Sequence, residues 1–248
     1  MLKKKGYSFY SSLSSTKRVD DFFTTFCELL NFINSDNSKY SNFDSKKLSK
    51  KILFLKKKKP EKIKFLYNTL NHTSSFINLF ELNSIRTKAA KILNCSKNNL
   101  IICEHQFRID YPKDSKHTLK PHQDISFYPQ DLNGSSGLVC NISLHNITSE
   151  MGSAIIYPYS HSKGKMNFLK KRNTSDSSGQ RSIKKSFFQE FKKKIIETKK
   201  SDVVFYHMNL IHSSGLNISN KVRYSAIARI FNPHGSSFRK FEKQTKLI

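Results

Sequence analysis

The stretch PHQDISFYP, residues 121–129, places His122 and Asp124 two residues apart. In an extended strand, residues i and i+2 project to the same face, so both side chains can reach one point while Gln123 turns away. An imidazole nitrogen and a carboxylate oxygen are two of the three ligands in the facial set that binds Fe(II) and leaves three coordination positions open. A His-x-Asp triplet also arises by chance, so it predicts a metal site only together with a third ligand.

The best candidate for the third ligand is His212, which ends the apolar run DVVFYHMNLIH and precedes a Ser-Ser-Gly turn. Alone it would be interpreted as a hydrogen-bonded core or strand-edge histidine. Arg223, eleven residues further on, could hold a carboxylate in bidentate fashion. The order of His-x-Asp, distal His and following Arg favours the ligand interpretation. Six further histidines are interpreted as structural or exposed: His105, His117, His145, His161, His207 and His234. Strand parity turns His207 away from His212.

These residues lie in short β-rich runs that begin near Asn99 and are separated by Gly, Asn, Ser and Pro clusters, a texture typical of an all-β barrel or jelly roll. The runs are LIICEHQFRI, HQDISFY, LVCNISLHNI, SAIIYP, DVVFYHMNLIH and VRYSAIARIF. A long polar segment from Lys163 to Gln180 is followed by the charged residues 181–196, for which a helix is considered. Together they predict an insertion or lid near 163–196.

The first 98 residues differ, because their apolar residues recur at helical spacing. Helices are predicted over 20–34, 46–56, 61–70 and 79–93. A chain of 248 residues is long enough for one sizeable core, so the prediction is a single α+β domain over 1–248. In it, a mainly helical part, 1–98, packs against a β core, 99–248.

The net charge of +26 is carried mostly by scattered Lys rather than Arg. The preferred interpretation is that these charges are exposed to solvent and have no specific partner. The second is that they attract an anionic small substrate, and the third is that they bind nucleic acid. The sequence has no run of about 18 apolar residues, so no membrane span is predicted. The expected location is cytoplasmic. The four cysteines have no metal-ligand or disulfide spacing and are expected to be reduced and buried.

In order and spacing, FRIDYP, LKPHQDISFYP, LHNITSEMGSAIIYPYSHSKG and SDVVFYHMNLIHSSGLNISNKVRYS resemble the phytanoyl-CoA dioxygenase-like branch of the Fe(II)/2-oxoglutarate oxygenases, over roughly residues 101–231. The resemblance implies a double-stranded β-helix (jelly-roll, cupin-like) core. It implies iron held by His122, Asp124 and His212, and the far carboxylate of 2-oxoglutarate held by Arg223 with help from Ser214. Lys120 and Gln106 become candidate pocket residues, and Phe127 and Tyr128 are expected to wall the pocket or pack behind it.

The resemblance implies a dioxygenase that hydroxylates a small organic substrate, anionic or acyl-CoA-linked among other classes, with conversion of 2-oxoglutarate and O2 to succinate and CO2. Tyr159 stands where relatives usually have glycine, and an aromatic residue common near Cys140 and Asn141 is missing. Two alternatives stay open. Arg223 and Arg229 form an R-x5-R pair that also resembles nucleic-acid demethylases of the same superfamily. The β-helix could instead be a non-catalytic binding module.

Overall fold

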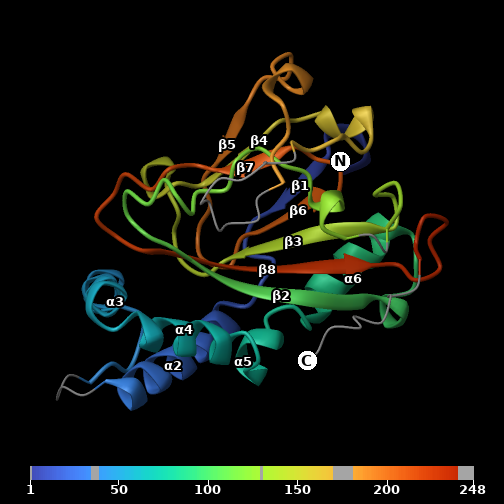
Figure 1. Cartoon of the computed structure of the whole chain (residues 1–248). Helices are drawn as coiled ribbons and strands as arrows, with labels where there is room; N and C mark the ends of the chain where they lie inside the picture. Colours follow the sequence, from blue (N-terminus) through green and yellow to red (C-terminus); the bar gives the residue numbers. More distant parts are fainter. Residues whose placement is uncertain (1, 35–38, 129–130, 170–180, 240–248) are drawn as a thin grey trace, which may run out of the picture.

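The computed structural model describes residues 2–34, 39–128, 131–169 and 181–239. Figure 1 shows three layers: a helical layer, a five-stranded sheet across the middle, and a three-stranded sheet above it. The large sheet has the order β1-β6-β3-β8-β2 and the small sheet the order β5-β4-β7, with every pair antiparallel. The strands are β1 Tyr7–Tyr10, β2 Ile101–Asp110, β3 Gly137–Ser143, β4 Ala154–Ile156, β5 Lys194–Ile196, β6 Val203–His207, β7 His212–Ser214 and β8 Arg223–Phe231.

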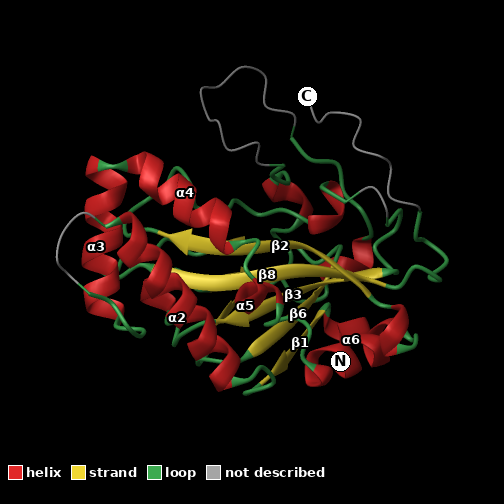
Figure 2. Cartoon of the chain, turned by 90° about the horizontal axis from the view of Figure 1, so that it is seen from below, coloured by secondary structure: helices red, strands yellow, loops and turns green. Residues whose placement is uncertain are grey.

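The helical layer covers the outer face of the large sheet, as Figure 2 shows from below. Its helices are α2 Thr16–Ile33, α3 Ser45–Lys58, α4 Pro60–Leu70, α5 Ser74–Ile77 and α6 Asn83–Leu93, and the short α1 Leu2–Lys5 precedes β1. The longest helix, α2, begins at Ser15, whose side chain accepts a hydrogen bond from the Arg18 N–H. It buries Phe22, Phe26 and Leu30, four residues apart, along one face.

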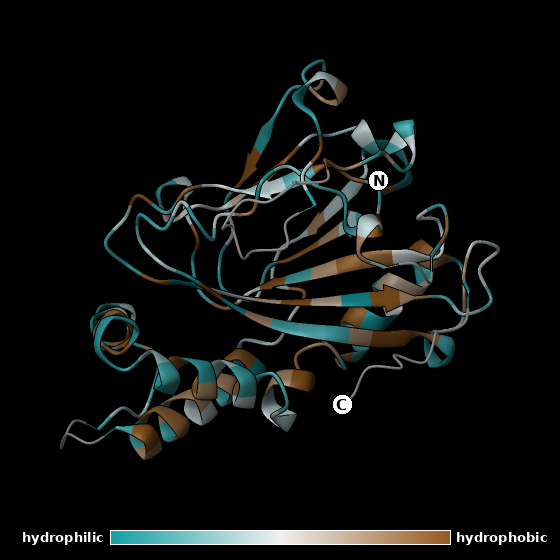
Figure 3. Cartoon of the chain, viewed as in Figure 1, coloured by the Kyte–Doolittle hydropathy of each residue, from teal (hydrophilic) through white to brown (hydrophobic). Residues whose placement is uncertain are grey.

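The two largest hydrophobic clusters lie between the helices and the large sheet and between the two sheets. In the first, the ring of Phe107 on β2 stacks on Tyr224 of β8 at 5.9 Å, and Phe22 of α2 meets Phe107 edge-on at 5.2 Å. Figure 3 shows the hydrophobic colouring on these strands and on the helices beneath them. The functional side chains lie on the opposite face of the large sheet.

A β-bulge in β2 decides which of its residues reach that face. Cys103 pairs with Arg229 but Gln106 pairs with Ile227, and Glu104 between them has a φ of +52°. Before the bulge, Cys103 packs between the sheets and Ile102 packs toward the helices. After it, Phe107 packs toward the helices, whereas Gln106 and Arg108 line the inner cavity.

Three local predictions are wrong. HQDISFY is not a strand, because Ile125 donates its N–H to the Met208 carbonyl and Phe127 donates back to Asp124, which closes a 3-10 turn over Asp124–Ser126. DVVFYHMNLIH is two strands, β6 and β7, separated by a turn in which the Leu210 N–H donates to the His207 carbonyl. Within 181–196, the structure has the 3-10 turn Lys185–Phe187 and then strand β5 where a helix was considered.

The helix predicted from residue 79 begins at Asn83, and part of the predicted insertion, 170–180, lies outside the described residues. The described cysteines are all free; Cys27 and Cys140 are buried, but Cys95 and Cys103 are partly exposed, so the expectation of four buried thiols is wrong for two. Among the described residues no helix combines the length and apolar character needed to cross a membrane.

Candidate metal centre and active site

His122 and His212 face each other across an isolated antiparallel bridge. Each donates its backbone N–H to the carbonyl of the other, both at 3.0 Å. Directly opposed residues in such a pair point their side chains to the same face. The two imidazole rings accordingly lie 4.3 Å apart between centroids. Two histidines 90 residues apart in the chain are thus brought together by backbone pairing.

The two rings are oriented in the same way. Nδ1 of His122 lies 2.8 Å from the Lys120 carbonyl and Nδ1 of His212 lies 3.0 Å from the Leu210 carbonyl. A carbonyl only accepts, so each Nδ1 carries the proton and each Nε2 keeps its lone pair for a metal. Such backbone contacts fix the tautomer of metal-binding histidines. Tyr206 stacks on His212 at 5.3 Å and further restricts that ring.

Asp124 completes the set. Its Oδ1 lies 3.3 Å from His122 Nε2 and 3.5 Å from His212 Nε2, and one ligand atom from each residue falls within 4.8 Å of the others. Its Oδ2 accepts two hydrogen bonds from Arg229, from Nε at 2.9 Å and from Nη2 at 2.8 Å. Burial acts to raise the pKa of Asp124, but the Arg229 guanidinium and the two neighbouring imidazoles together outweigh it and hold that pKa well below its ordinary value. The carboxylate is therefore ionised.

Arg223 does not stand free in the pocket. Its Nε and Nη2 bind Oδ2 of Asp110 at 3.2 and 2.8 Å, and its Nη1 donates to the Gly152 carbonyl. Arg108 binds the other oxygen of Asp110 at 2.6 Å. Burial acts to raise the pKa of Asp110, but the two guanidinium groups hold it well below the ordinary value. Two cations thus share one carboxylate.

Two adjoining cavities meet at the triad. The inner one, about 70 Å³, lies between the sheets. It is lined by His122, Asp124 and His212 together with Ser214, Arg223 and further residues of both sheets. The outer one, about 230 Å³, is lined by His122 and Asp124 with Gln106, Lys120, Phe127, Tyr128 and Arg181. The structure therefore has a small chamber behind the triad and a larger vestibule in front of it.

The structure brings the predicted site residues together. His122, Asp124, His212, Ser214 and Arg223 all line the inner cavity. The predicted pocket residues Lys120, Gln106, Phe127 and Tyr128 line the vestibule.

Residues predicted to lie off the site do so. Gln123 is buried away from the cavities, where its amide donates to the Gly164 and Asn209 carbonyls and accepts from the Met166 N–H. His207 lines neither cavity and its Nδ1 accepts the Asn209 N–H. Tyr159 has a φ of +70°, the left-handed conformation that favours the glycine expected there.

Sequence reasoning missed several residues of the site. Asp110 and Arg108 were not assigned a role, although both fall in the FRID motif. Arg229 was considered only as part of the R-x5-R pair with Arg223, yet it contacts Asp124. A signal for Arg229 existed: strand alternation from Arg223 places Ser225, Ile227 and Arg229 on the same face, and all of them line the inner cavity.

Comparisons with known proteins agree with this geometry. The family model described as phytanoyl-CoA dioxygenase (PhyH) matches residues 2–225. No curated protein sequence matches the chain. Among solved structures, the epimerase SnoN in complex with Fe3+, alpha ketoglutarate and nogalamycin RO is 15% identical, with a TM-score of 0.61 over 93% of this chain and 80% of that one.

Two further structures have the same fold. EvdO2 from Micromonospora carbonacea var. aurantiaca, complexed with 2-oxoglutarate, is 13% identical with a TM-score of 0.60, covering 98% of this chain and 92% of its own. The non-heme monooxygenase ThoJ is 12% identical with a TM-score of 0.62, covering 94% and 76%. At these identities the likeness concerns the fold.

Proposed function

Because the chain belongs to the phytanoyl-CoA dioxygenase family, we propose that it is an Fe(II)/2-oxoglutarate-dependent oxygenase that hydroxylates a small organic substrate. The predicted cofactors, iron and 2-oxoglutarate, are confirmed by the family assignment together with the His-Asp-His donor set. We interpret the two antiparallel sheets as the halves of a double-stranded β-helix, over a single domain in which the site lies between them.

One observation carries the proposal: the Nε2 atoms of His122 and His212 and one carboxylate oxygen of Asp124 converge on one point. Two imidazoles and one carboxylate on one face are the donor set of non-haem Fe(II) oxygenases. When bound, iron with 2-oxoglutarate supplies the oxidising chemistry, and the protein contributes orientation and electrostatics.

The chain's own residues prepare the site in three ways. Backbone carbonyls hold both histidines in the metal-binding tautomer, and Arg229 occupies Oδ2 of Asp124, so that Oδ1 alone faces the metal position. Arg223 and Ser214 line the inner chamber, where we place the far carboxylate of 2-oxoglutarate. Because Arg108 and Arg223 share one carboxylate, a positive charge remains for that second carboxylate.

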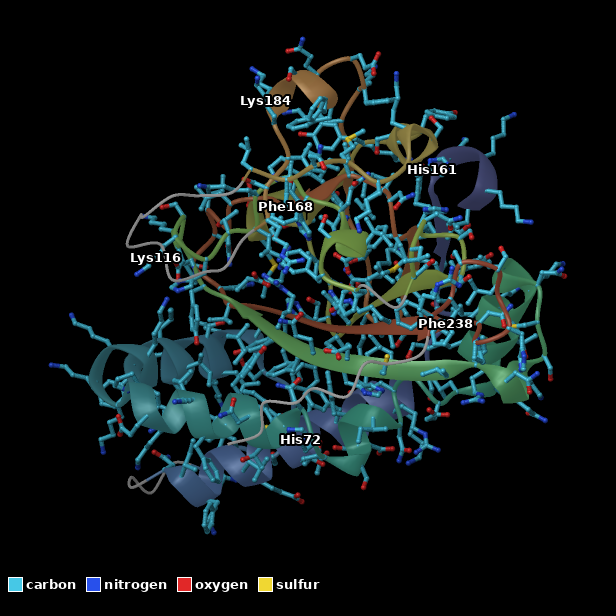
Figure 4. All side chains as sticks on the ribbon, turned by 45° about the vertical axis from the view of Figure 1, so that its right-hand side comes forward. His72, Lys116, His161, Phe168, Lys184 and Phe238 are labelled. Atoms are coloured by element: carbon cyan, nitrogen blue, oxygen red, sulfur yellow. The ribbon has the colours of Figure 1, made fainter. Side chains whose placement is uncertain are left out.

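The test measures binding before turnover. In anaerobic calorimetry, His122→Ala should lose Fe(II) binding because it removes one of three ligands. Arg223→Gln should keep the metal but weaken 2-oxoglutarate binding by about 2 kcal/mol, roughly thirtyfold, because a charge-assisted contact is lost. His72→Ala is the control, since His72 is an exposed residue of the helical layer and lies far below the sheet in Figure 4.

Unchanged Fe(II) affinity in His122→Ala would exclude the proposed metal site. Unchanged 2-oxoglutarate affinity in Arg223→Gln would move the carboxylate anchor to Arg229. Succinate formation coupled to O2 uptake, measured on the unaltered protein, separates an oxygenase from a binding module with the same fold. Salt-dependent retention on DNA or RNA, with a steep slope, would favour the nucleic-acid alternative.

A further inference from the structure

One arginine of the vestibule in front of the triad differs from the other two. Arg108 is paired with Asp110, and Arg229 is paired with Asp124. Arg181, in contrast, has no carboxylate or hydrogen-bond partner within the part of the chain that the structure describes. Its guanidinium carbon lies 5.0 Å from the ring centroids of both Phe127 and Phe168. Arg181 is therefore held by two aromatic rings at the wall of the vestibule.

The backbone around Arg181 is built into the site. Ile183 donates its N–H to the carbonyl of Pro121 at 2.8 Å, directly before His122, and it forms a bridge with Phe168. Leu169 donates its N–H to the Ser182 carbonyl at 2.8 Å. Figure 4 shows Phe168 near the centre of the molecule, whereas Lys184, three residues after Arg181, lies at the far tip. The short segment 181–183 thus brings Arg181 beside the metal ligands.

The contact between Arg181 and the two rings leaves its hydrogen-bonding capacity available. Aromatic rings attract the guanidinium through its charge and flat faces, whereas its five N–H donors lie in its plane. A planar fork of this kind matches the oxygens of a carboxylate or a phosphate. Because the rings fix the side chain in advance, less conformational freedom is lost when an anion binds.

The charge of the joined cavities also favours an anion. The guanidinium groups of Arg108, Arg223 and Arg229 face only the carboxylates of Asp110 and Asp124. A bound Fe(II) ion and a 2-oxoglutarate dianion cancel each other, so the positive excess persists in the loaded site, and Arg181 adds to it. Glu104 lies near Tyr128, but it is exposed and lines neither cavity.

We propose that the substrate carries an anionic group, a carboxylate or a phosphate, which Arg181 binds in the vestibule while Phe127, which lines the same cavity, flanks the adjoining part of the substrate. The remainder of the substrate then extends toward His122 and Asp124, which line the same cavity. This inference rests on the proposed function and specifies its substrate class. Arg181 is thereby a specificity-determining residue.

The experiment compares matched probes on the protein loaded with 2-oxoglutarate and with Mn(II) in place of iron. Phenylacetate, phenyl phosphate and uncharged phenylacetamide are titrated by calorimetry. At least one of the anions should bind about tenfold more tightly than the amide, because a charge-assisted contact is added. Arg181→Gln should abolish this preference, and Arg181→Lys should retain part of it. Lys184→Gln, which removes an exposed cation outside the vestibule, should leave the preference intact.

The two anions separate carboxylate from phosphate recognition. Equal binding of anions and amide, no binding of either anion at about 10 mM, or an undiminished preference in Arg181→Gln would overturn the inference. A 2-oxoglutarate titration of the same samples keeps the two proposals apart. If 2-oxoglutarate binds equally to the unaltered protein and to Arg181→Gln, the co-substrate site is intact in both, and the probe titrations test only the proposed substrate class. If it binds to neither, the proposed function fails and this inference fails with it.

Discussion

The two carboxylate oxygens of Asp124 have different partners. Oδ1 points toward the two histidines, whereas Oδ2 accepts both hydrogen bonds from Arg229. Arg229 is itself held, because its guanidinium also lies over the Tyr128 ring at 4.9 Å and donates to the Glu104 carbonyl. A carboxylate restrained in this way can offer a metal one oxygen, so the positions that 2-oxoglutarate and O2 need stay open. Arg229 is thus a positioning residue.

We expect Arg229→Gln to weaken Fe(II) or Mn(II) binding by roughly tenfold to a hundredfold, the usual effect of losing a partner of a metal ligand. Arg229→Lys should restore part of the affinity, because it keeps the charge but not the fork. Calorimetric metal titration measures both. Arg86→Gln is a matched control, since it breaks an arginine–carboxylate pair with Glu81 at the surface. Metal affinity in Arg229→Gln equal to that of Arg86→Gln would contradict this role.

At the scale of residues, the sequence predicted which residue types form the site, but it did not predict which side chains contact each other. His-x-Asp spacing and a distal histidine were enough to select three residues that the fold brings together. The partner of Arg223 could not be predicted, because Asp110 reaches it only through the pairing of β2 with β8. Arg181 was missed for a similar reason, since nothing local connects residue 181 with Phe127.

At the scale of elements, β7 and the turn after it depend on one close backbone approach. Gly152 has a φ of +76°, and a Cβ there would lie 2.5 Å from the Gly215 carbonyl oxygen and 2.8 Å from the Asn217 nitrogen. The Gly152 carbonyl also accepts a hydrogen bond from Arg223. This glycine therefore lets β4 and the chain after His212 come together beside the inner chamber.

Gly152→Ala should lower the free energy of unfolding by more than Gly164→Ala. Gly164 has a φ of +71° and a ψ of −160°, a conformation almost confined to glycine, so alanine there costs about 1–3 kcal/mol of backbone strain, but nothing lies within 4 Å of an added Cβ. Gly152→Ala adds a clash with backbone atoms and should cost several kcal/mol in total. Urea unfolding followed by circular dichroism compares the two, and equal losses would show that the close approach is unimportant.

Most strands and helices were predictable, because hydrophobic periodicity identified the β-rich half and the helical half. Prediction failed where tertiary hydrogen bonds override a local pattern. HQDISFY has the composition of a strand, yet Ile125 donates to Met208 across the fold and the chain turns at Asp124. The result still suits the expected chemistry, because the bridge at His122 and the turn at Asp124 direct both side chains to one point.

At the scale of the whole molecule, His145 joins the helical layer to the large sheet. Its ring stacks on Phe43 at 5.3 Å, and its Nε2 accepts the backbone N–H of Tyr224 at 2.9 Å. Burial lowers the pKa of His145 to about 4. A protonated ring would lose this acceptor, so the folded state keeps the imidazole neutral.

Stability should therefore fall as pH drops. The unfolded chain binds a proton near pH 6.5 and the folded chain only near pH 4, so stability is complete above pH 6.5 and decreases between these values. The loss from His145 is about 3 kcal/mol. His207, whose pKa is also lowered to about 4 by burial, adds to the total. Urea unfolding at several pH values should show a smaller loss for His145→Gln than for the unaltered protein, and parallel losses would contradict this account.

The bulge in β2 affects how the residues that line this site can change during evolution. Arg108 faces the cavity and Phe107 the helices because one extra residue near Glu104 reverses the alternation of the strand. The charge of the chamber therefore depends on the number of residues in β2 as well as on their types. Deletion of one residue near Glu104 would turn Phe107 toward the chamber and Arg108 toward the helices, although neither residue is substituted. Insertions and deletions in this strand therefore change the site more abruptly than substitutions do.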